Sequence, residues 1–176
     1  MSYQRLIIPL LILSLILALS GCGGSGGLTP TIPEAEDQEN GVLYLEPANL
    51  ALTPSESFIV ELKATSITDL KGYSVTLSYD PTLLSLQEAE EGPLLSAEGK
   101  TFFYTNADAT KGIILIDCAI LGSEAGISSG EGTLAIFSFT SLKAGSTGIE
   151  FSLARIRNTH NKEIITTIRN GLIRSE

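Results

Sequence analysis

Residues 70–84 read Leu-Lys-Gly-Tyr-Ser-Val-Thr-Leu-Ser-Tyr-Asp-Pro-Thr-Leu-Leu, and this stretch decides the fold class. Its apolar side chains alternate with small or polar ones, which places them on one side of an extended strand. That side carries Tyr73, Val75, Leu77 and Tyr79. The other side carries Gly72, Ser74, Thr76 and Ser78. The pattern predicts a strand with one buried face, for which Leu77 is the central core residue.

The same alternation recurs along the chain, in residues 42–45, 57–64, 134–139, 149–154 and 164–168. In the segment 149–154 it places Ile149, Phe151 and Leu153 together on one side. Turn-forming residues separate these runs, and no window shows a sustained period of 3.6 residues. Residues 41–176 are therefore predicted to form one all-β domain, a β-sandwich of about nine short strands. One helical turn is expected at Asp80–Leu84, because Asp80 can cap it and Pro81 suits its first position.

The first 21 residues have the pattern of a secretory signal. Arg5 precedes an apolar run over residues 6–19, and a membrane-spanning helix needs about 20 such residues. The segment Leu19-Ser20-Gly21-Cys22 resembles the lipobox of bacterial lipoproteins, in which the Cys receives the lipid. We therefore expect residues 1–21 to be removed and Cys22 to anchor a secreted protein at the cell surface or the outer face of the cell envelope. The alternative is an uncleaved membrane helix with a chance Cys.

Residues 22–40 are predicted to form a flexible linker before the domain at 41–176. They contain four Gly, two Pro and four acidic residues, with no pattern that could build a core. A flexible chain of this length spans roughly 25 Å on average and about 60 Å when fully stretched. The linker would therefore hold the domain off a membrane surface.

Charge and composition exclude several function classes. The chain carries 11 basic and 20 acidic residues, so its formal charge is 11 − 20 = −9, which disfavours nucleic-acid binding. One His and two Cys are too few for a structural zinc site. Any triad enzyme would depend on His160, which lies in an apparent hairpin turn without a nucleophile motif. The sequence thus predicts a protein that is not an enzyme and needs no cofactor.

The segment 70–84, with its Tyr79-Asp80-Pro81 end, is similar to the third-strand signature of cohesin domains. A strand near residues 57–62 precedes it, and the segments 132–139 and 145–147 resemble the family's later strand and turn. The resemblance covers essentially all of residues 41–173 and implies a jelly-roll sandwich related to carbohydrate-binding modules. It implies a non-catalytic domain that binds dockerin modules of other proteins and assembles cellulosome-like complexes.

The resemblance also implies that the partner lies on the outward face of one sheet. The residues expected there are Gly72, Ser74, Thr76, Ser78, Tyr104, Ile113, Leu115 and Asp117. Cohesins carry an Asn and an Asp on this part of the third strand, where this chain has Gly72 and Ser74. The excess of acidic residues favours a partner with a basic helix face.

The strand predicted at residues 113–121 is apolar on both sides, although a sandwich buries only one. Two interpretations remain open. The second side could be an exposed patch for a partner. It could instead be covered by Leu94 and Leu95 or by residues 122–130.

Direct polysaccharide binding is an alternative function, and a purely structural envelope domain is another. Sugar binding favours planar aromatic side chains, but the chain has no Trp, and Tyr73 and Tyr79 belong to the predicted core. Tyr104, beside Phe102 and Phe103, is the best exposed aromatic residue.

Four further features have plain structural interpretations. Cys118 is expected to be a buried apolar residue and His160 a solvated turn residue. The acidic run of Glu88, Glu90 and Glu91 is interpreted as a solvated loop. A calcium site would use the oxygens of Asn106, Asp108, Thr110 and Asp117. Their spacing does not match an EF-hand, so a polar hairpin is expected there instead of a metal site.

Overall fold

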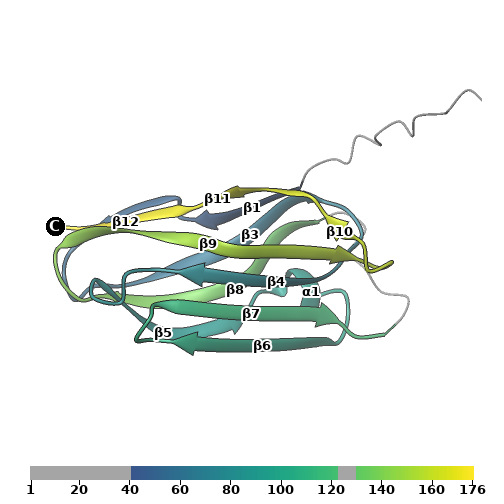
Figure 1. The fold of residues 1–176 in the computed structure, drawn as a ribbon, viewed down its shortest axis with the longest axis horizontal. Coiled ribbons are helices and arrows are strands. Elements are labelled where there is room, and N and C mark those ends of the chain that lie inside the picture. Colours follow the sequence, from purple (N-terminus) through teal and green to yellow (C-terminus); the bar gives the residue numbers. More distant parts are fainter. Residues whose placement is uncertain (1–40, 123–129) are drawn as a thin grey trace, which may run out of the picture. The chain divides into compact units, whose positions relative to one another are not determined.

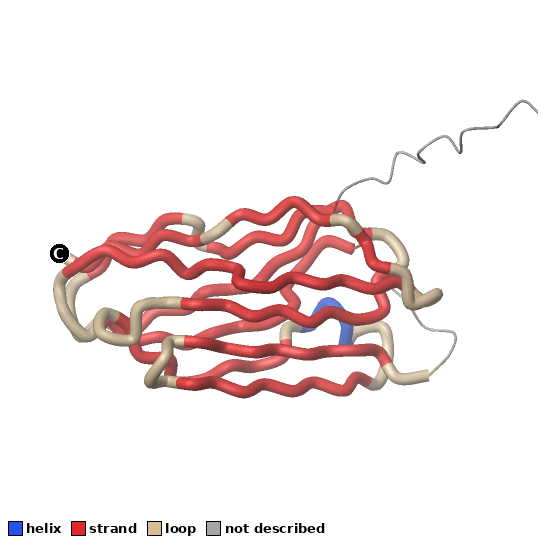
Figure 2. Tube along the Cα trace, in the orientation of Figure 1, coloured by secondary structure: helices blue, strands red, loops and turns tan. Residues whose placement is uncertain are grey.

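The computed structural model describes residues 41–122 and 130–176. These residues form two β-sheets packed face to face, with one short helix at one end (Figures 1 and 2). The predicted all-β sandwich is therefore confirmed. The predicted signal, linker and lipid-bearing Cys22 lie outside the described residues. Within those residues, no helix is long and apolar enough to cross a membrane.

The first sheet has five strands in the order β11-β1-β3-β8-β5. Its strands are β11 (Thr166–Arg169), β1 (Gly41–Glu46), β3 (Ser57–Ile67), β8 (Gly130–Ser141) and β5 (Leu84–Glu91). The pair β3 and β8 forms the centre of this sheet, and its inward side carries Val60, Leu62, Phe137 and Phe139.

The second sheet has seven strands, six of them in the order β2-β12-β9-β4-β7-β6, with β10 beside β9. Its strands are β2 (Asn49–Leu52), β12 (Gly171–Ser175), β9 (Gly145–Asn158), β4 (Leu70–Ser78), β7 (Ile113–Ile120), β6 (Thr101–Asp108) and β10 (Glu163–Ile164). The stretch of residues 70–84, which decides the fold class, thus begins with β4, an interior strand between β9 and β7 (Figure 1).

The C-terminal residues move from one sheet to the other. β10 pairs with β9 in the second sheet, β11 then runs parallel to β1 in the first, and β12 returns to the second. β12 also runs parallel to β2. These parallel pairings tie the C-terminal strands to the first strands of the domain, so both ends of residues 41–176 are held in the sandwich.

The core forms where the inward side of β4 meets the first sheet. Val75 and Leu77 are fully buried, and Tyr73 and Tyr79 are nearly so, as the alternation predicts. The Tyr79 ring contacts Phe139 edge-on, with centroids 5.2 Å apart, a favourable geometry for aromatic pairs. The Tyr73 hydroxyl donates a 2.7 Å hydrogen bond to the Leu134 carbonyl of β8. This bond joins the two sheets and satisfies a phenol whose pKa burial raises well above its usual value.

Cys118 is buried on the inward side of β7, as predicted, and it forms no disulfide. Its thiol lies 3.6 Å from the Glu91 carboxylate. Burial, with the nearby Glu91 charge, raises the pKa of the Cys118 thiol to about 12. The thiolate form is therefore suppressed at neutral pH.

One local prediction is confirmed and two are corrected. Asp80 does cap one turn, accepting a bond from the Thr82 N–H, and the Leu84 N–H donates to the Asp80 carbonyl as in a single helical turn. The sandwich has twelve strands among the described residues instead of about nine, because short strands such as β2 and β10 add to the longer alternating runs. The one helix of the described residues, α1, is Pro93–Ser96. The acidic run forms part of β5, with Glu88 and Glu90 exposed, and is not a loop.

Leu77→Ala is expected to lower the free energy of unfolding by about 2–5 kcal/mol, because it opens a cavity in a fully packed position. Denaturant titration measures this loss. Thr76→Ala, on the outward side of the same strand, is the matched control and should cost no more than about 1 kcal/mol. A loss below about 0.5 kcal/mol for Leu77→Ala would contradict the assignment of the buried face.

Cys118 is expected to resist thiol reagents in the folded protein at pH 8, reacting at least about 100-fold more slowly than in denaturant. A thiol reagent reacts with a thiolate that it can reach. Burial blocks access to the Cys118 sulfur and suppresses its thiolate form. A spectrophotometric thiol assay with and without denaturant measures the ratio. Rapid reaction of the folded chain at Cys118 would contradict this account.

Candidate partner-binding face

The outward side of the second sheet brings together all eight residues that the sequence singled out. On β4 and β7, Ser74 lies opposite Asp117 and Thr76 opposite Leu115. Tyr104 of β6 lies opposite Asp117 from the other side. The remaining predicted residues extend the face, with Gly72 opposite Ala119 and Ser78 opposite Ile113.

The apolar part of this face is exposed to solvent. Phe102 is 55% exposed, Tyr104 45%, Leu153 37% and Ile113 36%. Leu115 is half-buried among them. Apolar groups gathered on one sheet face in this way are typical of a surface that binds another molecule.

The structure favours one of the two interpretations of β7. Leu95 of α1 is buried in the core, Leu94 packs against the core, and α1 lies mainly against β8, so these residues do not cover the outward side. The other proposed cover, residues 122–130, lies largely outside the described residues. Among the described residues, the outward side of β7 is an accessible surface.

A hollow of about 430 Å³ lies at one end of this face. Its lining includes the small residues Gly72, Ser74 and Ala119 of β4 and β7, which we call its floor, together with aromatic and charged residues. The lining residues are Lys71, Gly72, Tyr73, Ser74, Phe102, Asp117, Cys118, Ala119, Arg155, Arg157, Asn158, Thr159 and Asn161. Five of the thirteen come from β9 and the turn that follows it, which the sequence analysis did not include in the face.

Gly72 keeps the floor of the hollow open. A Cβ atom at this position would lie 2.8 Å from the Cys118 carbonyl oxygen and 3.1 Å from the Ala119 side chain. The Asn implied here by the family resemblance would therefore require the neighbouring backbone of β7 to shift. With Gly72 there is no side chain to protrude from this part of the face.

Opposite charges flank the floor. Across β4, Ser74 lies between Arg155 of β9 and Asp117 of β7. Neither charged side chain makes a hydrogen bond or ion pair with another residue of the described parts of the chain. Arg157 lies one step further along β9, where its guanidinium donates a 2.9 Å bond to the Asn161 carbonyl. The face thus offers one unpaired cation and one unpaired anion about two strand spacings apart, which is roughly 10 Å.

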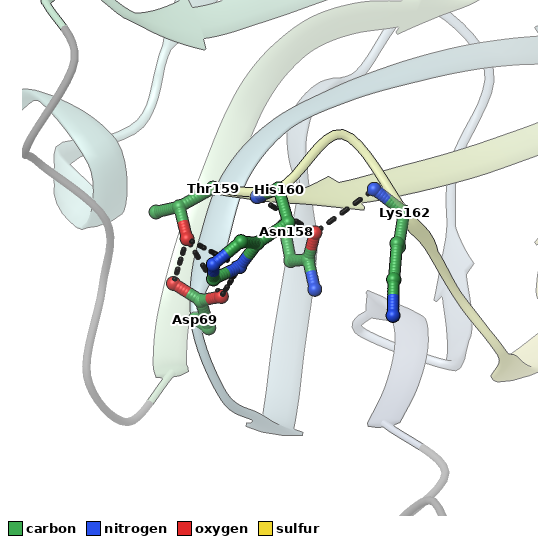
Figure 3. Close-up of polar contacts among 5 residues, drawn as sticks. All are labelled: Asp69, Asn158, Thr159, His160 and Lys162. Atoms are coloured by element: carbon green, nitrogen blue, oxygen red, sulfur yellow. Dashed lines mark hydrogen bonds and ion pairs between the residues drawn. The ribbon is translucent and has the colours of Figure 1, made fainter.

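The hairpin that borders the hollow is held in place by side chains (Figure 3). The Asn158 amide oxygen accepts bonds from the backbone N–H groups of His160, at 3.0 Å, and Lys162, at 2.9 Å. The Thr159 hydroxyl donates to the Asp69 carboxylate in the β3–β4 turn, at 2.8 Å and 2.9 Å from its two oxygens. The His160 side chain is 78% exposed, which confirms its prediction as a solvated turn residue.

Asp108 is part of a turn, not of a metal cluster. One of its carboxylate oxygens accepts from the backbone N–H groups of Thr110 and Lys111, and the other pairs with the Lys111 ammonium at 3.1 Å. These bonds lower the pKa of Asp108. Asp117 lies further along β7, opposite Tyr104. No group of three or more acidic, His or Cys residues in the described parts of the chain could hold a metal ion.

Sequence reasoning missed Phe102, Leu153 and Arg155 as members of this face. Phe102 is two residues from Tyr104 on a strand and so shares its side, a signal that was present in the sequence. Leu153 was placed with Phe151 on one side of its strand. A register shift at Thr76/Leu77 opposite residues 151–153 puts Leu153 outward, and no sequence signal marks that irregularity.

The comparisons with known proteins agree with this geometry. The cohesin domain family matches residues 48–171, well over half of the chain. No sequence among curated proteins is similar enough to count as a relative. Three similar solved structures each cover 78% of this chain.

The first is the sixth cohesin of scaffoldin B from Acetivibrio cellulolyticus, solved with a Cel5 dockerin, at TM-score 0.67 and 16% identity over 99% of that chain. The second is a non-cellulosomal cohesin from the archaeon Archaeoglobus fulgidus, at TM-score 0.64 and 20% identity over 91% of that chain. The third is a type I cohesin–dockerin complex from Clostridium thermocellum, at TM-score 0.67 and 15% identity over 99% of that chain.

At these identities the structures show a shared fold, and the family match adds the sequence evidence that the fold alone lacks. The family match and the two-sheet sandwich built around residues 70–84 lead to one conclusion: this chain belongs to the cohesin domain family.

Proposed function

We propose that the protein is a non-catalytic binding module that holds a dockerin-type module of another protein against the outward face of β9, β4, β7 and β6. The observation that carries the proposal is the exposed apolar patch on that face, beside a hollow with charged walls. Membership of the cohesin family supports this choice of partner. So do the solved relatives, several of which are complexes with dockerins.

The chemistry of the face suits a protein partner. Ile113 and Leu115 can bury apolar area at the centre of an interface. The hydroxyl groups of Ser74, Thr76 and Ser78 supply small donors and acceptors beside this apolar strip. Such an arrangement resembles the apolar centre and polar rim of known interfaces.

The local charge of the face differs from the charge of the whole chain. The net charge of −9 favours a basic partner, but the walls of the hollow carry Arg155 and Arg157 beside the single acid Asp117. A partner with an acidic group facing Arg155 and a basic group facing Asp117 would satisfy both unpaired side chains. We therefore expect a partner of mixed charge at the contact, drawn in over longer range by its basic residues.

Direct polysaccharide binding is the second candidate function. Phe102 and Tyr104 are exposed and lie on the same side of β6, and Phe102 lines the hollow. Flat aromatic side chains of this kind are what a sugar ring would stack on. The absence of Trp from the sequence makes this the weaker candidate.

The proposal includes the N-terminal residues. Residues 1–21 would be a cleaved signal and Cys22 the lipid-bearing first residue of the mature protein. Residues 22–40 would be a linker and 41–176 the binding domain, displayed at the cell surface. Removing residues 1–21 takes away Arg5 and no acid, so the mature charge would be 10 − 20 = −10. Several acyl chains on one Cys would give a stable anchor, whereas a single chain is marginal.

Leu115→Glu in the full chain is expected to weaken capture of a dockerin module encoded in the same genome by at least about 100-fold, because an unpaired charge buried at an interface centre costs about 3–5 kcal/mol. Surface plasmon resonance with the dockerin module immobilised measures the affinity.

Ile59→Glu is the matched control. Ile59 is 56% exposed on the outward side of β3, in the other sheet, so the same change there should leave the affinity unaltered. Equal binding by a folded Leu115→Glu variant would refute this face as the site. Retention of the chain on insoluble polysaccharide, without any dockerin captured, would support the second candidate.

Cys22→Ala is expected to move the protein from the membrane fraction to the soluble fraction of the producing cells, because it removes the residue proposed to carry the lipid. Fractionation and labelling with a radioactive fatty acid measure the change, and Ser25→Ala in the linker is the control. A Cys22→Ala protein that stays in the membrane would show that residues 6–19 are themselves the anchor.

A further inference from the structure

The edges of the two sheets are not equally protected. An edge strand displays unpaired backbone N–H and C=O groups, and proteins guard such edges with short strands, bulges, Pro or charged side chains. The edge strands among the described residues are β11, β5, β2, β6 and the two-residue β10, which pairs with β9 alone. All of them except β6 follow this rule.

β11 and β2 have only four residues each. β5 is interrupted by a register shift at Leu86/Glu88 and carries three glutamates. β6 has eight residues in unbroken register with β7, and its sequence Thr-Phe-Phe-Tyr-Thr-Asn-Ala-Asp contains no Pro and no Lys. In Figure 1, β6 lies at the margin of its sheet with no strand beyond it.

The open backbone groups of β6 can be identified. The Lys100 carbonyl, one residue before the strand, accepts a 2.8 Å bond from the Leu121 N–H on the β7 side. Along an antiparallel strand, successive residues direct their N–H and C=O groups to opposite sides. Residues at even positions therefore bond to β7. The N–H and C=O groups of Thr101, Phe103, Thr105 and Ala107 point to the open edge.

We propose that this edge pairs antiparallel with β6 of a second copy of the protein, with Tyr104 opposite Tyr104 on the two-fold axis. In this register Thr101 pairs with Ala107, and Phe103 with Thr105, so all four open residues of each copy form hydrogen bonds. The register also places Lys100, at one end of the edge, opposite Asp108, at the other. Asp108 pairs with Lys111 of its own copy, so its carboxylate would be shared between Lys111 and the Lys100 of the second copy. This self-complementary charge pattern is the reason for choosing a second copy over an unrelated strand.

The pairing joins two sandwiches through one continuous sheet. Residues opposite each other in a sheet point to the same side, so the two partner-binding faces lie on the same side of the joined sheet. A single strand edge is a small interface, typical of weak association. It therefore acts where copies are concentrated, as on a shared surface, and there it presents two docking faces together.

Disulfide trapping in the full chain tests the pairing. Tyr104→Cys places two thiols at a non-hydrogen-bonded pair across the axis, where Cα atoms lie about 4.5 Å apart, within reach of a disulfide. In Asn106→Cys, the matched control, the two thiols are offset by four residues, or about 13 Å along the strands. Both residues are exposed, so neither change threatens the core.

The expected result is that mild oxidation links Tyr104→Cys into dimers at a yield at least about tenfold above that of Asn106→Cys and of the unmodified chain, because only the first pair meets the disulfide distance limit. Similar yields for the two variants, or no dimer for Tyr104→Cys, would overturn the proposal. The unmodified chain controls for Cys22 and for Cys118, both of which remain in every variant.

Two second changes, made in the Tyr104→Cys background, show whether the trapped dimer uses this edge. Thr105→Pro removes an N–H that points to the open side, and Lys100→Glu places like charges opposite each other without altering the backbone. Each should reduce the dimer yield to the Asn106→Cys level. Unchanged yield in the folded Lys100→Glu variant would overturn the register. Dockerin capture by Lys100→Glu, measured separately, reports on the proposed function independently of self-association.

Discussion

Burial of one side of β4 is the constraint on which the rest of this structure depends. Tyr73, Val75, Leu77 and Tyr79 project from the middle of the second sheet into the core formed with β3 and β8 of the first. Apolar burial supplies most of the stabilisation, but it does not by itself set the position of one sheet on the other. The Tyr73 hydroxyl does so locally, because it donates a bond to the Leu134 carbonyl across the sandwich. A slip by one residue would expose the core side chains and leave this buried hydroxyl without a partner.

The same alternation creates the surface on which function is proposed. Once the apolar side of β4 is buried, its small polar side must face solvent, and the neighbouring strands add what β4 lacks. β7 contributes apolar side chains on both faces, β6 adds two exposed aromatic rings, and β9 adds the arginines. Gly72 contributes to the hollow because it has no side chain, and the backbone of β7 lies too close to this position to admit one without a shift. The proposed partner face therefore depends on outward residues that differ from strand to strand. Stability comes from the apolar residues that the inward sides of these strands have in common.

One end of the hollow depends on polar contacts instead of packing. Asp69, in the β3–β4 turn, bonds to Thr159 in the hairpin after β9, and Asn158 organises that hairpin from within. Arg157 bonds back to the same hairpin through Asn161. These bonds hold the hairpin and Arg157 in position at this end of the face, and they do so without burying apolar surface. A domain with a negative net charge can therefore present a locally basic wall, because net charge does not specify where individual charges lie.

The sequence by itself determined the class of fold, the buried side of β4 and the burial of Cys118, because period-two alternation depends only on local geometry. It also determined the resemblance to cohesins and, through the same alternation, the eight residues of the predicted face. It did not reveal that the acidic run belongs to β5, that Leu153 turns outward at a bulge, or that the segment after β9 changes sheets twice. Strand register, bulges and sheet switching depend on contacts between residues far apart in the chain, which a local pattern does not encode. Only the tertiary structure decided that Arg155 and Asp117 lie on opposite sides of Ser74, because they come from strands about 40 residues apart that meet only through β4.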